Sequence, residues 1–378
     1  MKSLKITTEL LNKILAEHGF YKYRLYGVAD VVIKIVGKKI HLLSDTALLA
    51  LVKEVLRGSQ APEYKVVYEA IIHYSTKRYI NYIKECLQRH EPYIYTKRDI
   101  ATAAFTYFKN CFVRLEAGKA PEIKYYSDLN GYVWSSQVID FDFTGFDHTK
   151  GEFETFLCAA ITGRISDDPY NEVELHKLNS VKSAIGYMLH RYKNAETTKA
   201  VIFTDAPVMP SEIQGQSGKS LIAKALGCLA KVTMIDGPNF KPDYDFAFQS
   251  VRYNTDIINL NDVGAKFKFS SLYSVLCEDL IINKKGVETI TIPFLFSPKM
   301  LISCAADIIS SKGESNKGRQ HIIEFSNFWN YDNPPAKHFG HLLFADWDKS
   351  EWERFYTFCM HCIIYYLENG LIDFPTTK

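Results

Sequence analysis

The feature that most constrains the fold of this chain is a glycine-rich segment at residues 215–220, with the sequence Gly-Gln-Ser-Gly-Lys-Ser. It follows a short apolar run at residues 200–204 and precedes a segment with helical spacing at residues 219–230. The order of strand, glycine-rich loop and helix is the context that a phosphate-binding loop requires. Fully apolar short runs are typical of strands in a buried parallel sheet.

Further apolar runs follow the loop, and segments with helical spacing separate several of them. They lie at residues 232–235, 256–260, 299–304 and 321–325. Strands that alternate with helices predict an α/β fold with a parallel sheet.

The first half of the chain has a different pattern, which is mostly helical with some strand. Helical spacing occurs at residues 4–19, 42–56, 64–90, 97–109, 152–163 and 174–195, and strand patterns occur within residues 22–43, 111–115 and 123–126. Another helix is expected within residues 346–371. We therefore predict a mainly helical N-terminal domain at 1–195, an α/β core at 196–335 and a helical C-terminal tail at 336–378.

Composition excludes several classes of protein. The chain has 45 basic and 43 acidic residues and a net charge of +2, so nucleic-acid binding would require basic residues that are grouped locally. Its 47% hydrophobic and 23% charged residues are ordinary for a globular protein and exclude a disordered or fibrous chain. No apolar run approaches the ~20 residues that span a membrane.

Cysteine usage and the N-terminus indicate the compartment. The eight cysteines are scattered, unlike those of a small disulfide-rich secreted domain, and the first residues lack the apolar stretch of a signal peptide. A reducing, cytoplasmic location is the expectation. Cys359 and Cys362 have zinc-like spacing, but no second pair lies nearby, and the apolar flanks favour a buried helix face.

The glycine-rich loop suggests how a nucleotide would be held. Its backbone N–H groups would surround the β-phosphate, Lys219 would supply charge to the β- and γ-phosphates, and the Ser220 hydroxyl would bind Mg²⁺. The full pattern places a glycine at position 213, where this chain has Ile213. The alternative is a surface turn before a helix. The candidate nucleotide-binding residues are Gly215, Gln216, Ser217, Gly218, Lys219 and Ser220.

A second candidate motif ends the apolar run at residues 255–263. Its carboxylate, Asp262, is the group that a Mg²⁺·ATP site needs beside the loop. Asn261 stands where many ATPases have a second acid. The alternative is an ordinary Asn-Asp turn at a strand end.

Taken together, these motifs resemble those of superfamily 3 helicases, in the form found in bacteriophage and large DNA virus primase-helicases. The resemblance starts from residues 212–221 and covers roughly residues 200–330, with an extension to residues 343–352. The segments that carry it downstream of the loop lie at residues 235–237, 246–251, 257–263, 267–272, 292–294, 297–303 and 318–326.

The resemblance implies an AAA+-like P-loop ATPase that assembles as a ring, usually a hexamer, with ATP and Mg²⁺ between subunits. Single-stranded DNA would pass through the centre, and the N-terminal domain would help to oligomerise and could contact DNA. The implied function is an ATP-dependent DNA helicase in viral or phage DNA replication in the host cytoplasm, with a separate primase or polymerase as a candidate partner. The alternatives are a nucleotide-dependent DNA-binding or loader protein with weak hydrolysis, and a DNA-packaging P-loop ATPase.

The resemblance also assigns candidate residues outside the loop. A DNA-contacting hairpin would occupy residues 281–288, with Lys284 and Lys285 at its tip, where two ammonium groups suit a phosphate backbone. A solvated turn is the alternative there. Arg319 would be the arginine finger, with a surface salt bridge as its alternative. Ala305 stands where the family usually has an asparagine that helps to orient water, and Arg319 stands where a pair of arginines is common. With Asn261, these departures leave the speed of turnover open.

Overall fold

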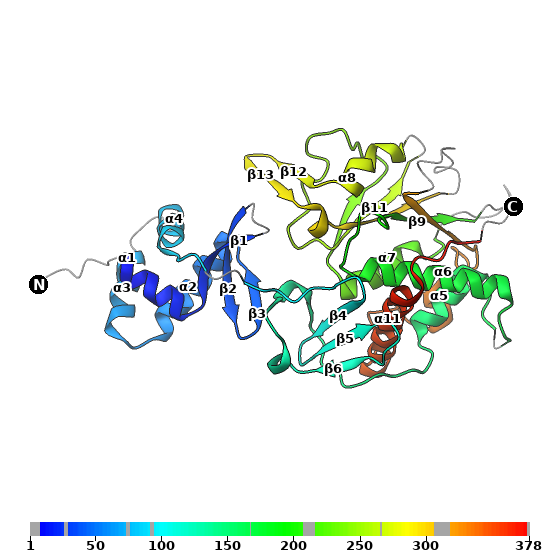
Figure 1. The fold of residues 1–378 in the computed structure, drawn as a ribbon, viewed down its shortest axis with the longest axis horizontal. Coiled ribbons are helices and arrows are strands. Elements are labelled where there is room, and N and C mark those ends of the chain that lie inside the picture. The colour runs from blue at the N-terminus through cyan, green and yellow to red at the C-terminus, as the bar shows by residue number, and fades with distance from the viewer. Residues whose placement is uncertain are drawn as a thin grey trace, which may run out of the picture. The chain divides into compact units, whose positions relative to one another are not determined.

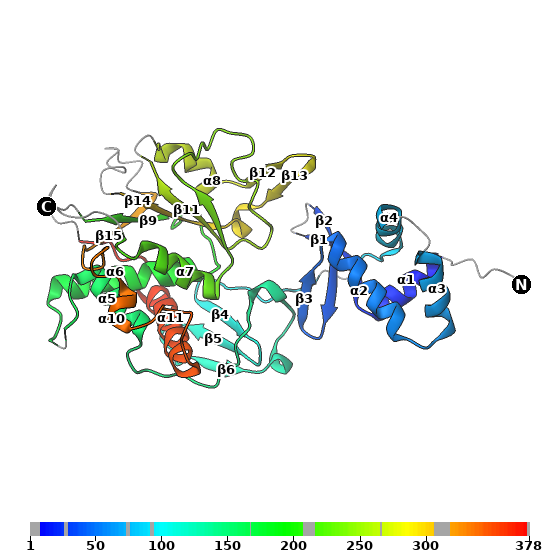
Figure 2. The same ribbon diagram turned by 180° about the vertical axis from the view of Figure 1, so that it is seen from behind.

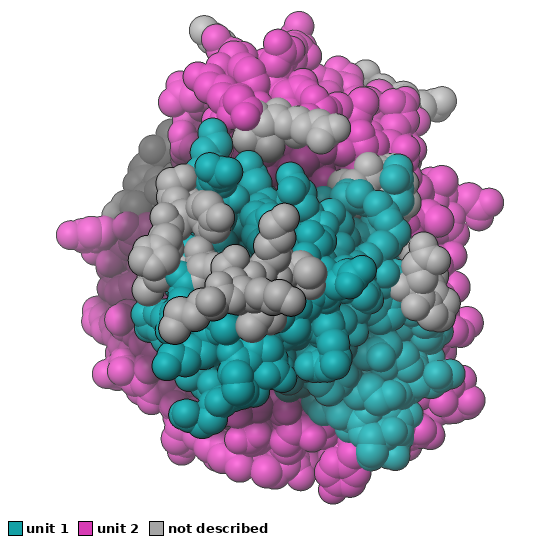
Figure 3. Space-filling view, turned by 90° about the vertical axis from the view of Figure 1, so that its left-hand side faces the viewer, with its two compact units in different colours: residues 1–97, 126–138 teal, residues 98–125, 139–378 magenta. Residues whose placement is uncertain are grey.

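The computed structural model describes residues 8–25, 29–72, 76–90, 94–166, 168–206, 216–264, 267–305 and 318–375. The chain divides into two compact units, one formed by residues 1–97 with 126–138 and the other by residues 98–125 with 139–378 (Figure 3). The segments predicted from the sequence, 1–195, 196–335 and 336–378, do not coincide with these units. The difference arises because helices from before residue 196 and after residue 335 pack into the second unit.

The first unit combines a small sheet with a group of helices. The sheet has the order β1-β2-β3-β7, in which the last pair is parallel and the others are antiparallel. Buried leucine, isoleucine, valine and aromatic side chains of the helices form its core, together with Phe20 of the first strand. The elements are α1 (Thr8–Glu17), β1 (Phe20–Leu25), β2 (Ala29–Val36), β3 (Lys39–Leu42), α2 (Asp45–Gly58), α3 (Pro62–Ile72), α4 (Thr76–Cys86), η1 (Tyr126–Asp128), β7 (Val133–Trp134) and η2 (Ser135–Gln137).

The second unit is built around a five-stranded sheet in the order β10-β11-β14-β9-β15, and every adjacent pair is parallel. The prediction of an α/β fold with a parallel sheet is therefore confirmed. The central strands are almost wholly buried because helices and loops cover both faces, which explains their continuous apolar sequence. The strands are β9 (Ala200–Asp205), β10 (Val232–Asp236), β11 (Ile257–Val263), β14 (Lys299–Cys304) and β15 (Gln320–Phe325).

Helices form the next layer of this unit. Figures 1 and 2 both place α6 and α7 between the parallel sheet and a layer that holds α11 and β4–β6. Polar caps begin two of the long helices: Asn171 forms a capping box with Glu174, and Asp348 accepts from the N–H of Glu351. The helices are α5 (Glu152–Thr162), α6 (Glu172–Leu189), α7 (Lys219–Leu229), α8 (Tyr273–Cys277), α10 (Pro335–Phe339) and α11 (Lys349–Asn369).

One predicted helix is wrong. Residues 97–109 contain the strand β4 (Ala103–Phe108), which pairs antiparallel with β5 (Phe112–Glu116), and β5 pairs with β6 (Glu122–Lys124). All six residues of β4 are buried, so the segment has no polar face of the kind that a surface helix would need. Its Phe, Thr and Tyr side chains favour a strand in such a site. The short β8 (Val138–Ile139) follows β4 in the order of the same sheet.

Helices α6 and α11 are in close contact at Gly186. A Cβ atom at this position would lie 2.0 Å from the carbonyl oxygen of Cys362 and 2.7 Å from the Cβ of Tyr366. The two helices can therefore pack in this way only with glycine here, although glycine costs helix propensity.

We predict that Gly186→Ala lowers the free energy of unfolding by about 2 kcal/mol or more, because the backbones of two helices must separate. Urea denaturation measures this change. Gly227→Ala is the matched control in α7: its Cβ would meet the Cγ2 of Val232 at an ordinary 3.8 Å, so stability should hold or rise by up to ~1 kcal/mol. Equal stability of the two variants would contradict the proposed close packing.

Candidate nucleotide-binding site

The loop between β9 and α7 is described from Gln216 onward, so Gly215 lies outside the described residues. Gly218 caps the start of α7 with φ of +92°, and a Cβ atom there would lie 2.6 Å from the ring of Phe156. Glycine is therefore required at this position by both conformation and space. No side chain caps the α7 terminus in the described part of the chain, which leaves the first N–H groups of the helix able to bind an anion.

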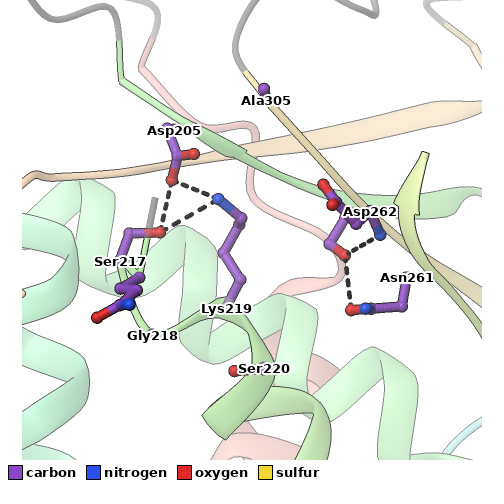
Figure 4. Close-up of a pocket in the computed structure, with 10 residues that line it drawn as sticks. Asp205, Ser217, Gly218, Lys219, Ser220, Asn261, Asp262 and Ala305 are labelled. Carbon is purple, nitrogen blue, oxygen red and sulfur yellow. Dashed lines mark hydrogen bonds and ion pairs between the residues drawn. The ribbon is translucent and has the colours of Figure 1, made fainter. Parts of the chain in front are cut away.

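Lys219 points into a polar group formed with two other side chains (Figure 4). Its Nζ forms an ion pair with the Oδ1 of Asp205 and donates to the Oγ of Ser217 at 3.2 Å. Ser217 in turn donates to the same Asp205 oxygen. The side chains of Lys219 and Asp205 are each 16% exposed, so both charges are mostly shielded from water. Asp205 ends β9 and was not among the residues predicted from the sequence.

The end of β11 carries Asn261 and Asp262 on an irregular backbone. The register shifts between Leu260 and Val263, and Asp262 has a φ of +60°, which is costly for a residue other than glycine. The Asp262 N–H donates to the Oγ of Ser303 at 2.9 Å, and that hydroxyl donates to the Oδ1 of Asn261 at 3.2 Å. Through these two hydrogen bonds, Ser303 on β14 stabilises the irregular backbone that positions Asp262.

These groups share one pocket of about 370 Å³, which is within the range of small-molecule sites. The carboxyl ends of parallel strands meet at one edge of a sheet, so loop and strand ends that are far apart in sequence come together there. Its lining residues are Asp205, Gln216, Ser217, Gly218, Lys219, Ser220, Asn261, Asp262, Ser303 and Ala305. The pocket thus brings together all of the described loop residues, Asn261, Asp262 and Ala305.

The oxygen ligands in the pocket fit Mg²⁺. The Ser220 hydroxyl and the Asp262 carboxylate both line it, and hard oxygen ligands are those that Mg²⁺ prefers. Mg²⁺ commonly takes one or two carboxylates and completes its shell with phosphates and water. No cluster of three or more His, Cys, Asp or Glu side chains suited to a metal occurs among the described residues. Cys359 and Cys362 are both buried within α11.

The predicted hairpin is present, but it does not line the pocket. Strands β12 (Leu280–Lys284) and β13 (Val287–Ile292) pair antiparallel, and Gly286 turns the chain with φ of +69°. Lys285 is exposed, with its Nζ 5.7 Å from the centre of the Phe246 ring. Partial burial, and then the charge of Arg252, lower the pKa of Lys284. The helical turn η4 (Phe294–Phe296) leads from the hairpin into the start of β14.

Arg319 does not join the pocket of its own chain. It precedes β15, and Phe325 at the far end of that strand pairs with Asp205. The six residues of β15 therefore place Arg319 about 20 Å from the pocket edge of the sheet. Its guanidinium lies 4.6 Å from the centre of the Tyr273 ring.

Comparisons with known proteins find distant similarity to solved structures. No profile of a known protein family matches the chain, and no curated protein does. Among solved structures, the chain is similar to the apo form of the NrS-1 C-terminal region, with a TM-score of 0.42, 13% identity and coverage of 96% of this chain and 71% of that one. It is also similar to JCV helicase bound to a small molecule, with a TM-score of 0.28, 15% identity and coverage of 57% and 60%. Similarity at these values does not assign a function to this chain.

In the described part of the chain, no helix combines the length and apolarity that crossing a bilayer would take.

We predict that Ser303→Ala weakens binding of a Mg²⁺-bound nucleotide by about tenfold, because Asp262 loses the hydroxyl that positions its backbone. Binding of the nucleotide without Mg²⁺ should hardly change. Isothermal titration with an ATP analogue, with and without Mg²⁺, measures both. Ser303→Thr, which keeps the hydroxyl, is the matched control. An equal loss of affinity in both conditions would contradict a role in metal positioning.

Proposed function

We propose that this chain is a Mg²⁺-dependent ATPase that acts as a DNA helicase in viral or phage replication. The observation that carries the proposal is a pocket that brings together loop residues 216–220, Lys219 above all, and Asp262 at the end of β11, which is separated from β9 by β14 in the parallel sheet. A helix N-terminus, an ammonium group and a carboxylate for the metal are the parts that hold and polarise a triphosphate.

Each residue has a defined part in this proposal. Backbone N–H groups at the start of α7 would bind the phosphates, and Lys219 would leave Asp205 to neutralise charge on the β- and γ-phosphates. Ser220 and Asp262 would hold Mg²⁺, whose chemistry is to offset the charge that develops on the transferred phosphoryl group. Asn261, whose Oδ1 accepts from Ser303, would orient a water molecule by hydrogen bonding rather than by charge.

The parallel sheet fits the AAA+-like fold that the sequence resemblance implies, and the proposal includes the ring that such ATPases form. In this arrangement Arg319 would act on the pocket of a neighbouring subunit, which agrees with its place at the opposite edge of the sheet from its own pocket. Single-stranded DNA would pass Lys284 and Lys285, which stand on a turn and outside the pocket lining. A separate primase or polymerase is the proposed partner.

A second candidate function is a nucleotide-dependent DNA-binding or loader protein with weak hydrolysis. It is favoured by the pocket lining, in which Asn261 and Ala305 stand where an acid and an asparagine would speed turnover. ATP turnover with and without single-stranded DNA separates the two functions. Unwinding of a forked duplex tests the helicase itself, and a DNA-packaging motor would fail that assay.

Lys219→Ala tests the phosphate loop. We expect ATP hydrolysis to fall by at least about 10³-fold because developing charge on the phosphoryl group loses its ammonium partner. Steady-state phosphate release measures turnover, and circular dichroism checks that the fold survives. A variant with wild-type activity would mean that the loop is not the catalytic site.

The double variant Lys284→Ala/Lys285→Ala tests the hairpin. If both ammonium groups contact phosphates, affinity for single-stranded DNA should drop for every sequence alike, and the salt slope of binding should fall by about one to two. Fluorescence anisotropy at several salt concentrations measures this, and basal ATPase should persist. An unaltered slope would assign the two lysines to a solvated turn.

Mixing two variants tests Arg319 as a finger in trans. Arg319→Ala and Lys219→Ala should each be inactive alone, whereas mixed rings would carry some interfaces with both intact residues and should regain part of the ATPase activity. Absence of recovery in rings that demonstrably exchange subunits would argue against the finger. Normal activity of Arg319→Ala alone would exclude it.

A further inference from the structure

One carboxylate in the pocket has no chemical role in the proposed function. Of the lining residues that the structure describes, two are acids, Asp205 and Asp262. Asp262 is the proposed metal ligand, and the position beside it, which often supplies a second acid in ATPases, is Asn261. Hydrolysis needs a group that accepts the proton of the attacking water, and a positioned general base contributes about 10²–10⁴-fold.

The position of Asp205 in the pocket is fixed by strand pairing and by hydrogen bonds. It is the last residue of β9, a strand paired on one side with β14 and on the other with β15. Its Oδ1 accepts from both Lys219 and Ser217, and its side chain is 16% exposed. Figure 4 shows Asp205 and Asp262 on opposite sides of the pocket, with Lys219 between them.

The sheet also sets the separation of the two acids. Strand β14 lies between β9 and β11, so Asp205 and Asp262 end strands that are two spacings apart, about 10 Å. This distance leaves room for a phosphoryl group and one water.

We infer that Asp205 is the catalytic carboxylate of the proposed ATPase and replaces the acid that Asn261 does not supply. The inference rests on the proposed function. A water hydrogen-bonded to the free oxygen of Asp205 attacks the γ-phosphorus, forming an O–P bond, while the bond from that phosphorus to the β,γ-bridging oxygen breaks. ADP leaves with the electron pair of that bond, and the proton of the water passes to Asp205, which then releases it to solvent. The products are ADP and inorganic phosphate.

The decisive variant is Asp205→Asn, which keeps the size of the side chain and an oxygen that can accept from Lys219. Single-turnover hydrolysis should fall by at least about 100-fold, whereas affinity for a fluorescent, non-hydrolysable ATP analogue should stay within about threefold or rise, because a charge that repels phosphate is gone. Asp236→Asn is the matched control. Asp236 ends β10, the outer strand of the same parallel sheet, is exposed and does not line the pocket, so the rate should be unchanged.

A second arm moves the carboxylate. In the Asp205→Asn background, Asn261→Glu should restore hydrolysis by about tenfold or more, because an acid returns to the pocket from the end of β11. If Asp205→Asn does not fold by circular dichroism, Asp205→Glu replaces it. That variant keeps the charge but shifts the carboxylate by one methylene, and it should bind the analogue normally while hydrolysing at least about tenfold more slowly.

Two results would overturn the inference while leaving the proposed function intact. Hydrolysis by Asp205→Asn within about threefold of wild type would remove any catalytic part for the carboxylate. A loss of analogue binding as large as the loss of hydrolysis would reduce Asp205 to a structural partner of Lys219. By contrast, a wild-type protein that fails to bind the analogue, or binds it equally well after Lys219→Ala, would end the proposed function and the inference with it.

Discussion

The parallel register of β9, β14 and β11 is the constraint on which the whole site depends. Phe203 pairs with Ser303, and Val263 pairs with Cys304, so the three strands end at the same edge of the sheet. Burial of their apolar side chains on both faces drives this arrangement. The packing of these apolar side chains brings the polar residues at the strand ends together, so no long-range polar contact has to form first.

The charged residues of the pocket require additional cations when a triphosphate binds. One described lining residue is cationic, Lys219, against the carboxylates of Asp205 and Asp262. A triphosphate carries several further negative charges, so the N-terminus of α7 and Lys219 alone would leave a large negative excess. Mg²⁺ at Ser220 and Asp262 offsets this excess in the proposed function, and a guanidinium from a neighbouring subunit would offset more of it in the transition state.

The sequence was informative where a feature depends on the order of nearby residues. The strand and helix that flank Lys219 and the acid at the end of β11 are local features, and each lies where the pattern predicts; the hairpin at Lys284 lies where the family resemblance implies one. Asp205 and Ser303 were missed because their importance depends on which strands become neighbours, although an acid that ends an apolar run was a visible signal for Asp205. The helix predicted over β4 was wrong because, in a fully buried segment, the spacing of apolar residues does not distinguish a strand from a helix.

The central claim is that a nucleotide binds in the pocket where β9, β14 and β11 end. A structure of the protein with Mg²⁺ and a non-hydrolysable ATP analogue tests it most directly. The account predicts phosphates against the first turn of α7, the ammonium of Lys219 moved from Asp205 to the phosphates, and a metal between Ser220 and Asp262. A nucleotide bound elsewhere, or a Lys219–Asp205 pair that persists beside bound nucleotide, would contradict it.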